Sequence, residues 1–303
     1  MSLDSRAHVG PHVSDPRHRS HASSPRAAPL HGSRFFRSCI ALGALVTISA
    51  AAQAQGVLGV AQQFSVLGGS AVTNTGATTL TGDLGVFPGP TSSITGAGTI
   101  TFASGVNQGN NAVSQLAKTN SFAAYVSLAS LPFTTDLTGQ NLGGLTLTPG
   151  VYKFGSSAQL TGNLILNFLG NPNSVFVFQI GSTLTTASAS SVTATNAAPG
   201  AGVFWNIGSS ATLGSTTAFI GNIIADQSIT LNEGATIACG RAIALVGAVT
   251  MINNTVSNSC PKLDQGSGGF GGTGTTVPEP STFALFGVSL LGLAVTVRRR
   301  RAG

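Results

Sequence analysis

Residues 210–251 read SATLGSTTAFIGNIIADQSITLNEGATIACGRAIALVGAVTM, and this run contains one short pattern three times. SATL at 210–213, SITL at 228–231 and AVTM at 248–251 each place a threonine between two apolar residues, and the pattern returns at a near-constant step. A unit of this length cannot bury its own apolar face, so successive units must stack on one another. We therefore expect a mainly β fold, a β-solenoid whose coils bring Thr212, Thr230 and Thr250 into a ladder at strand spacing.

Other segments repeat in the same way. GNIIA at 221–225 returns as GRAIA at 240–244, and VFQIGS at 177–182 returns as FWNIGS at 204–209. The second of these steps is longer than the others and is expected to be one coil with an extra loop. An antiparallel sandwich would also contain many short strands, but the near-constant step favours the solenoid.

One segment, from about 104 to 130, breaks the strand pattern. Its apolar residues fall at helical spacing, and Pro132 ends the helix just beyond it. This predicts one long α-helix packed alongside the solenoid, with strands on either side at about 57–102 and 133–258.

The charge of +6 is misleading because it comes from the two ends of the chain. Residues 1–37 carry six Arg and two Asp, and residues 277–303 carry four Arg and one Glu, so the part between them is −1. Its few scattered cations cannot form a groove for phosphates, which argues against a nucleic-acid partner.

The N-terminal part, residues 1–54, has the pattern of an extension followed by a secretory signal peptide. Arg34 and Arg37 precede the apolar run CIALGALVTISAAA, and Ala-Gln-Ala at 52–54 is a typical cleavage site. The mature chain is expected to begin near Gln55. The long leader indicates either a misassigned start codon or a basic arm.

The C-terminal part has two segments, a Gly-rich linker at 263–276 and the sequence VPEPSTFALFGVSLLGLAVTVRRRRAG at 277–303. Pro278, Glu279 and Pro280, the apolar run and the arginine cluster together resemble the PEP-CTERM sorting signal; the alternative is a permanent transmembrane anchor helix. The resemblance implies transient anchoring in the inner membrane, cleavage by an exosortase-type enzyme, and delivery to the cell surface or matrix of a Gram-negative bacterium.

Catalytic chemistry is poorly represented in residues 55–262. All five histidines precede residue 32, which excludes histidine-based catalysis and metal binding from this part, and we expect neither a cofactor nor an enzyme. Asp226 and Glu233 are expected to be solvated acids rather than a glycosidase pair. Cys239 and Cys260 are expected to form a disulfide in an exported protein; two free redox thiols are the weaker alternative.

Several motifs, in order, resemble the ice-binding proteins of bacteria, fungi and algae. They are VLGGSAVTNTGATTLTGDLGVFPG (66–89), the helix after it, NLGGLTLTPGVYKF (141–154), NPNSVFVFQIGSTLTTASASSV (171–192), VFWNIGSSATLG (203–214) and GRAIALVGAVTMINNTV (240–256). The resemblance implies a right-handed, discontinuous solenoid of triangular cross-section, in which the N-terminal coil lies beside later ones. It also implies a flat face that adsorbs to ice.

Residues 55–262 contain 28 Thr but only eight charged residues, a composition suited to an uncharged hydroxyl face. Relatives carry a loose T-(A/G)-x-(T/N) motif on the ice face, matched here at 75–78, 138–141 and 193–196. The candidate ice-binding residues are Thr75, Thr78, Thr138, Asn141, Thr193, Thr195, Thr212, Thr230 and Thr250.

These observations predict an exported ice-binding protein whose partner is the ice crystal surface. The alternative is a matrix or adhesion protein of the biofilm, which binds exopolysaccharide or copies of itself.

Overall fold

The computed structural model of the protein describes residues 56–198 and 200–260. In these residues the chain forms 22 strands, one α-helix and three 3-10 helices. Every strand pairing is parallel, and the strands form one 15-stranded and one seven-stranded sheet. The expected signal peptide (1–54), linker (263–276) and sorting segment (277–303) with Pro278, Glu279 and Pro280 lie outside the described residues.

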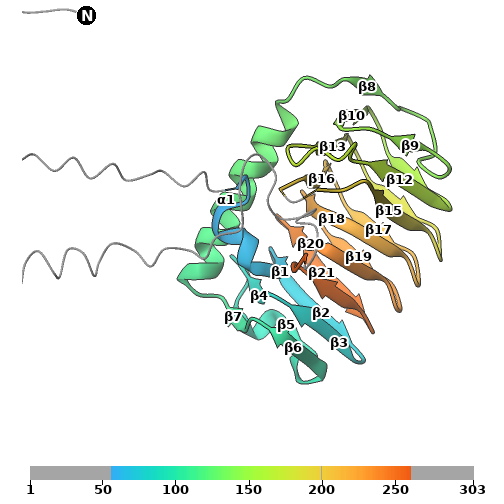
Figure 1. Ribbon diagram of the computed structural model, residues 1–303. Coiled ribbons are helices and arrows are strands. Elements are labelled where there is room, and N and C mark those ends of the chain that lie inside the picture. Colours follow the sequence, from blue (N-terminus) through green and yellow to red (C-terminus); the bar gives the residue numbers. More distant parts are fainter. Residues whose placement is uncertain (1–55, 199, 261–303) are drawn as a thin grey trace, which may run out of the picture. The chain divides into compact units, whose positions relative to one another are not determined.

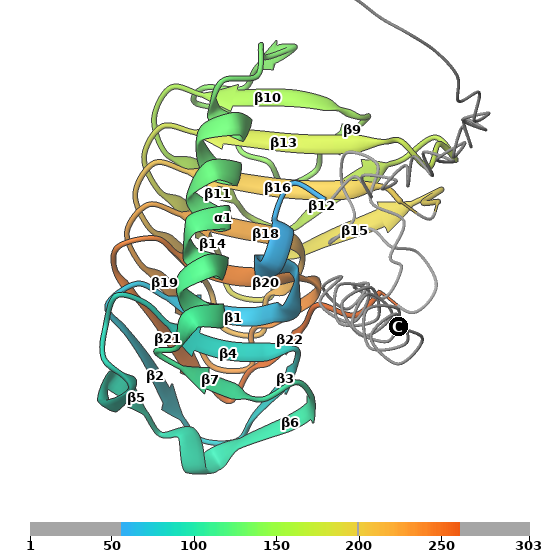
Figure 2. The same ribbon diagram turned by 90° about the vertical axis from the view of Figure 1, so that its left-hand side faces the viewer.

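The strands are arranged in three ladders, because each turn of the chain contributes one strand to each ladder (Figures 1 and 2). The first, here called the helix-side ladder, lies under the α-helix. Its strands, in spatial order, are β8 (Thr135–Asp136), β10 (Gly150–Phe154), β13 (Val175–Ile180), β16 (Gly202–Ile207), the second halves of β18 (Ala218–Ala225) and β20 (Thr236–Ala244), β1 (Phe64–Gly68), β4 (Asp83–Val86) and β7 (Asn107–Gly109).

The second ladder is the seven-stranded sheet. Its strands, in spatial order, are β11 (Ala158–Leu160), β14 (Leu184–Thr186), β17 (Ala211–Leu213), β19 (Ile229–Leu231), β21 (Ala248–Ile252), β2 (Ala71–Thr75) and β5 (Ile94–Thr95).

The third ladder continues from the helix-side ladder within the 15-stranded sheet, because β18 and β20 each span both. Its strands, in spatial order, are β9 (Thr146–Leu147), β12 (Asn163–Asn167), β15 (Ser191–Thr195), the first halves of β18 and β20, β22 (Thr255–Ser257), β3 (Thr78–Thr81) and β6 (Ile100–Ser104).

The coils do not follow one another in chain order. The first coil (β1, β2, β3) pairs on one side with the last coil (β20, β21, β22), as in the partners Val66 and Ala242, Thr73 and Thr250, and Thr79 and Thr255. We call this junction the seam. It confirms the discontinuous order implied by the family resemblance.

The helix α1 (Ala112–Ala129) crosses the strands of the helix-side ladder (Figure 2). The Oδ1 atom of Asn111 caps its first turn by accepting a hydrogen bond from the Ser114 amide at 2.9 Å. The expected start near residue 104 was therefore too early. Residues 107–109 form β7 instead, and Gly109 turns the chain with a φ of +57°.

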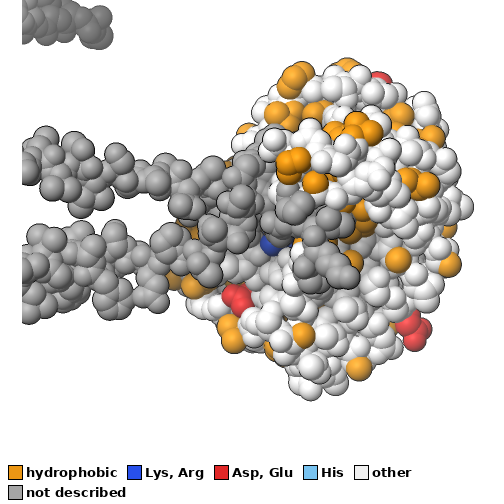
Figure 3. Space-filling model, in the orientation of Figure 1, with side chains coloured by type: hydrophobic (Ala, Val, Ile, Leu, Met, Phe, Trp, Pro, Cys, Tyr) orange, Lys and Arg blue, Asp and Glu red, His pale blue; other side chains and the backbone are white. Residues whose placement is uncertain are grey.

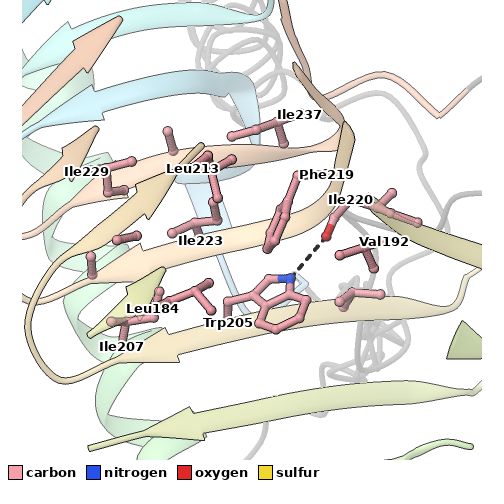
Figure 4. Packing of buried hydrophobic residues seen from close by; sticks show 14 of the residues in the cluster. Leu184, Val192, Trp205, Ile207, Leu213, Phe219, Ile220, Ile223, Ile229 and Ile237 are labelled. Atoms are coloured by element: carbon pink, nitrogen blue, oxygen red, sulfur yellow. Dashed lines mark hydrogen bonds between the residues drawn. The ribbon is translucent and has the colours of Figure 1, made fainter. Parts of the chain in front are cut away.

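The core is tightly packed around Trp205. This indole stacks on Phe178 with ring centroids 3.9 Å apart and contacts Phe219 at 4.8 Å, and its Nε1 donates to the Ile220 carbonyl at 3.0 Å (Figure 4). Such aromatic pairs add about 0.5–1.5 kcal/mol beyond the burial of their area. Each coil is thereby held to the next by side chains as well as by backbone hydrogen bonds.

The seam is reinforced beside the start of the described chain. The buried guanidinium of Arg241 donates to the Gln62 carbonyl and to Asn222 Oδ1. The 3-10 helix η1 (Gly59–Gln63) is thus tied to the last coil.

The expected disulfide is formed between Cys239 and Cys260, whose Cα atoms lie 4.9 Å apart. It closes a loop with a sequence separation of 21 residues and holds the end of the last coil to β20.

No helix in 56–198 or 200–260 is both long and apolar enough to cross a membrane. The apolar run 283–297, where the transmembrane segment is expected, lies outside these residues.

Candidate functional site: an uncharged threonine sheet

One outward position on the seven-stranded sheet is occupied by threonine in six consecutive strands. The strand registers align Thr185, Thr212, Thr230, Thr250, Thr73 and Thr95, in that order, with Gln159 on the strand beyond Thr185. We call these six residues the threonine ladder. Figure 1 shows β17, β19, β21 and β2 of this sheet side by side.

The local sequence explains why the threonines face outward. On β17, β19 and β21 the residues before and after the threonine are buried apolar side chains, as Ile229 and Leu231 are around Thr230. Alternation along a strand then directs the threonine to the other face. Strands in a sheet lie about 4.8 Å apart, so the five steps from Thr185 to Thr95 extend about 24 Å.

A second row of small side chains lies two residues before the ladder, about 6.6 Å away along each strand. Its hydroxyls are partly used within the protein: Thr183 Oγ1 donates to Ser157 Oγ at 2.8 Å, and Ser210 Oγ accepts from the Ser228 amide at 3.2 Å. The ladder differs from this row. None of its six hydroxyls makes a hydrogen bond to another described residue, so each hydroxyl is available to water.

Charged groups are kept off this sheet. Its seven strands contain no Asp, Glu, Lys or Arg. Asp226 and Glu233 lie in the turns at opposite ends of β19, outside the strand itself. On the side of the molecule seen in Figure 3, charged side chains are few and isolated.

The predicted site residues do not all belong to this sheet. Thr212, Thr230 and Thr250 are consecutive members of the ladder, and Thr75 is exposed at the end of β2 in the same sheet. Thr193 and Thr195 lie on β15, in the third ladder, and both are exposed.

The other three candidates each accept a hydrogen bond from a backbone amide. The prediction that Thr78 lies on the ice-binding face was wrong. Only 1% of Thr78 is exposed, and its Oγ1 accepts a hydrogen bond from the Asn254 amide, so it cannot belong to a surface face. Asn141 is exposed and forms a parallel bridge with Gln159, which places it in line with the threonine ladder; its Oδ1 also accepts from the amides of Gly143 and Thr161. Thr138 Oγ1 accepts from the Gly155 amide at 2.7 Å.

Thr138 also explains the one titration shift near these residues. Hydrogen bonds from the Thr138 side chain and amide lower the pKa of the exposed Asp136 carboxyl.

The three copies of the T-(A/G)-x-(T/N) motif lie at three different corners of the coils. The motif by itself did not identify a common face.

Three ladder threonines were missed from the sequence: Thr73, Thr95 and Thr185. The signal for Thr73 was present, because AVT at 71–73 is repeated as AVT at 248–250, near the other end of the domain. The two AVT segments belong to one row of threonines because the seam pairs β2 with β21, and that pairing is seen only in the structure.

The geometry defines a class of protein: parallel β coils with a helix along one ladder and an uncharged hydroxyl lattice on another. Comparison with known protein families agrees with this class. Residues 66–257 match the family described as ice-binding-like, and residues 276–301 match the PEP-CTERM protein-sorting motif. The chain belongs to the ice-binding-like family.

Individual relatives match over most of the chain. An ice-binding protein of Nostoc sp. (strain HG1) is 51% identical over 246 residues, 80% of this chain and 87% of the relative. A solved ice-binding protein from an Antarctic biological consortium is 44% identical with a TM-score of 0.62, over 66% of this chain and 89% of that one.

A second solved structure bears on the folding of the domain. The ice-binding protein of the ascomycete Antarctomyces psychrotrophicus is 40% identical with a TM-score of 0.62, over 67% of this chain and 98% of that one. A chain consisting almost entirely of this domain thus folds by itself.

Proposed function

We propose that this protein adsorbs to ice through the threonine ladder of its seven-stranded sheet. The single observation that carries the proposal is the run of six threonines in register on strands that contain no charged residue. Each threonine offers a methyl group and a hydroxyl on a stiff, β-branched stem. Methyl groups order water in the troughs between rows, and the hydroxyls hold that water by hydrogen bonds, so the layer can merge with a crystal.

The fold supports a flat site. Three ladders per coil are consistent with a right-handed solenoid of triangular cross-section, and the seven-stranded sheet is then one of its sides. The registers within this sheet contain no bulge, whereas the third ladder shifts register between Leu80 and Thr81. We therefore assign ice adsorption to the seven-stranded sheet and not to the third ladder with Thr193 and Thr195.

The place of action follows from the sorting motif at 276–301. The precursor is exported, held transiently in the inner membrane by residues 283–297, and processed by an exosortase-type enzyme near Pro278 to Pro280. The matrix alternative with exopolysaccharide as partner is not favoured, because the relatives that match most of the domain are named ice-binding proteins.

The test compares three arginine substitutions in residues 55–262, measured by thermal hysteresis and ice-crystal shaping. Thr230→Arg places a long charged side chain in the centre of the ladder and is expected to reduce hysteresis at least tenfold. Thr255→Arg makes the same change on the third ladder, and Thr119→Arg makes it on α1; both are expected to keep wild-type activity.

The melting temperature serves as the control for folding. Ladder threonines are surface residues, and such substitutions usually alter stability by no more than about 0.5 kcal/mol. Full activity of Thr230→Arg would reject the ladder, and loss of activity in Thr255→Arg alone would move the site to the third ladder. A wild-type domain that neither shapes ice nor shows hysteresis would reject ice binding altogether.

A further inference from the structure

Exposed large apolar side chains are concentrated in one segment of the described chain, the helix α1 and its flanks. In the described part of the chain, seven large apolar side chains are exposed, and five of them fall between residues 106 and 133. We call these five the apolar ridge: Val106, Leu116, Phe122, Val126 and Phe133, each between 48% and 56% exposed.

Three of the five residues lie on α1, which runs across the helix-side ladder from β7 toward β10 (Figure 2). At 3.6 residues per turn, Leu116, Phe122 and Val126 fall within about one third of the helix circumference, on the side opposite the buried Ala117, Ala124 and Leu128. Eighteen residues at 1.5 Å each give the helical part a length of about 27 Å. Polar residues between the apolar ones on this side are uncharged.

An apolar hollow lies beside the ridge. Val57, Ser127, Leu128 and Leu131 enclose a space of about 220 Å³ where the start of the described chain meets the end of α1. Single exposed apolar residues are ordinary on protein surfaces, but a row of them next to an apolar hollow is typical of an interaction site.

A lysine lies at one end of the ridge: Lys153 Nζ is 4.8 Å from the centre of the Phe133 ring. Exposed apolar side chains with a lysine at their margin favour the boundary between lipid headgroups and acyl chains.

The segment that follows the described domain limits how far the domain can lie from a membrane. Residues 261–275 separate Cys260 from the sorting motif at 276–301. The apolar run begins at residue 283, so 22 residues, 261–282, lie between it and Cys260, and they span at most about 73–79 Å when fully extended. Membrane insertion of the apolar run 283–297 would therefore confine the domain to the vicinity of the bilayer surface.

We propose that the apolar ridge is a lipid-contact surface, which seats the domain on the membrane while its sorting segment is anchored there. The ridge lies on the helix-side ladder and the threonine ladder on a different one, so lipid contact leaves the proposed ice site uncovered. Membrane contact by the ridge goes beyond ice adsorption and does not depend on it.

The test uses residues 55–262, which lack the sorting segment, with vesicles of phosphatidylethanolamine and phosphatidylglycerol. The wild-type domain is expected to co-sediment with the vesicles. The triple variant Leu116→Gln, Phe122→Gln, Val126→Gln keeps helix-forming residues and is expected to lower the partition coefficient at least tenfold. The matched control, Leu169→Gln with Val246→Gln, removes two equally exposed apolar side chains outside the ridge and is expected to bind as the wild type does.

Circular dichroism and the melting temperature of all three proteins verify that they are folded, and ice shaping by the same proteins separates this proposal from the previous one. Equal vesicle binding by wild type and triple variant, or none by either, overturns the lipid surface. Light scattering on the same samples identifies the competing occupant: a wild-type dimer that the triple variant dissociates, without vesicle binding, would show that the ridge pairs with a second copy of the chain.

Discussion

Replacing Lys118 with Met is expected to stabilise the protein. The Lys118 ammonium is buried under α1, and it has no hydrogen-bond partner among the described residues. Burial lowers its pKa from 10.5 to about 8, and the attraction of Asp226 opposes this only in part. Methionine has a similar length and flexibility and brings no charge to be desolvated.

The magnitude can be worked out from this pKa. At 1.36 kcal/mol per pH unit, the fall from 10.5 to about 8 sets an upper limit of about 3.4 kcal/mol. Because the side chain is only about half-buried, solvent screening reduces the gain to about 1–2 kcal/mol. Unfolding about 205 residues at about 2.1 cal/mol/K each then gives a rise in Tm of about 2–5 °C.

The stabilisation by Lys118→Met must decrease as the pH rises. The pKa is lower in the folded than in the unfolded protein, so the cost of the buried ammonium is complete below pH 8. It is lost as the pH rises from 8 to 10.5, because Lys118 is then neutral in the folded protein, and above 10.5 it is neutral in both states. Melting curves of residues 55–262 by circular dichroism at pH 7 and pH 10.5 measure both effects.

Lys153→Met is the matched control, since it removes the same charge from a lysine whose ammonium lies over the Phe133 ring. It is expected to change stability by no more than about 0.5 kcal/mol. A Tm for Lys118→Met at or below wild type at pH 7 would refute the reasoning. So would a gain that is as large at pH 10.5 as at pH 7.

Two further predictions concern the core and the disulfide. Trp205→Ala should lower stability by about 3–5 kcal/mol because the cavity cannot close, while Trp205→Phe, which keeps the stack on Phe178, should lose much less; calorimetry giving equal losses for the two would contradict the role of the stack. The double variant Cys239→Ser, Cys260→Ser should lose about 3 kcal/mol, because opening a loop of this length restores freedom to the unfolded chain. An unchanged denaturant midpoint would show that the disulfide does not stabilise the folded protein.

The repeats predicted more of the fold than secondary-structure propensity did. Their near-constant step correctly aligned Thr212, Thr230 and Thr250, and the one longer step correctly paired VFQIGS with FWNIGS, since Gln179 is the partner of Asn206. These predictions succeeded because a parallel stack places equivalent residues of successive coils side by side. The helix start was less accurate, since glycine turns and a short strand precede the cap at Asn111.

The site was harder to predict, for a physical reason. Whether a threonine faces water depends on its position within a coil, and the same residue type occurs on all sides of the stack. Thr78 matched the motif but is buried at a corner, whereas Thr185 matched no motif and belongs to the ladder. Strand register, and not local sequence, separates them.

The seam has a consequence for the order in which the molecule is completed. Its hydrogen bonds join residues as far apart as Asn253 and Ala77, or Arg241 and Gln62, 176 and 179 positions along the chain. During synthesis or passage through an export channel, the strands of the first coil therefore cannot pair with those of the last coil until the last coil has been released. Contacts of such long sequence separation form slowly. This delay keeps the polypeptide unfolded, and so able to pass through a channel, until nearly all of it has emerged.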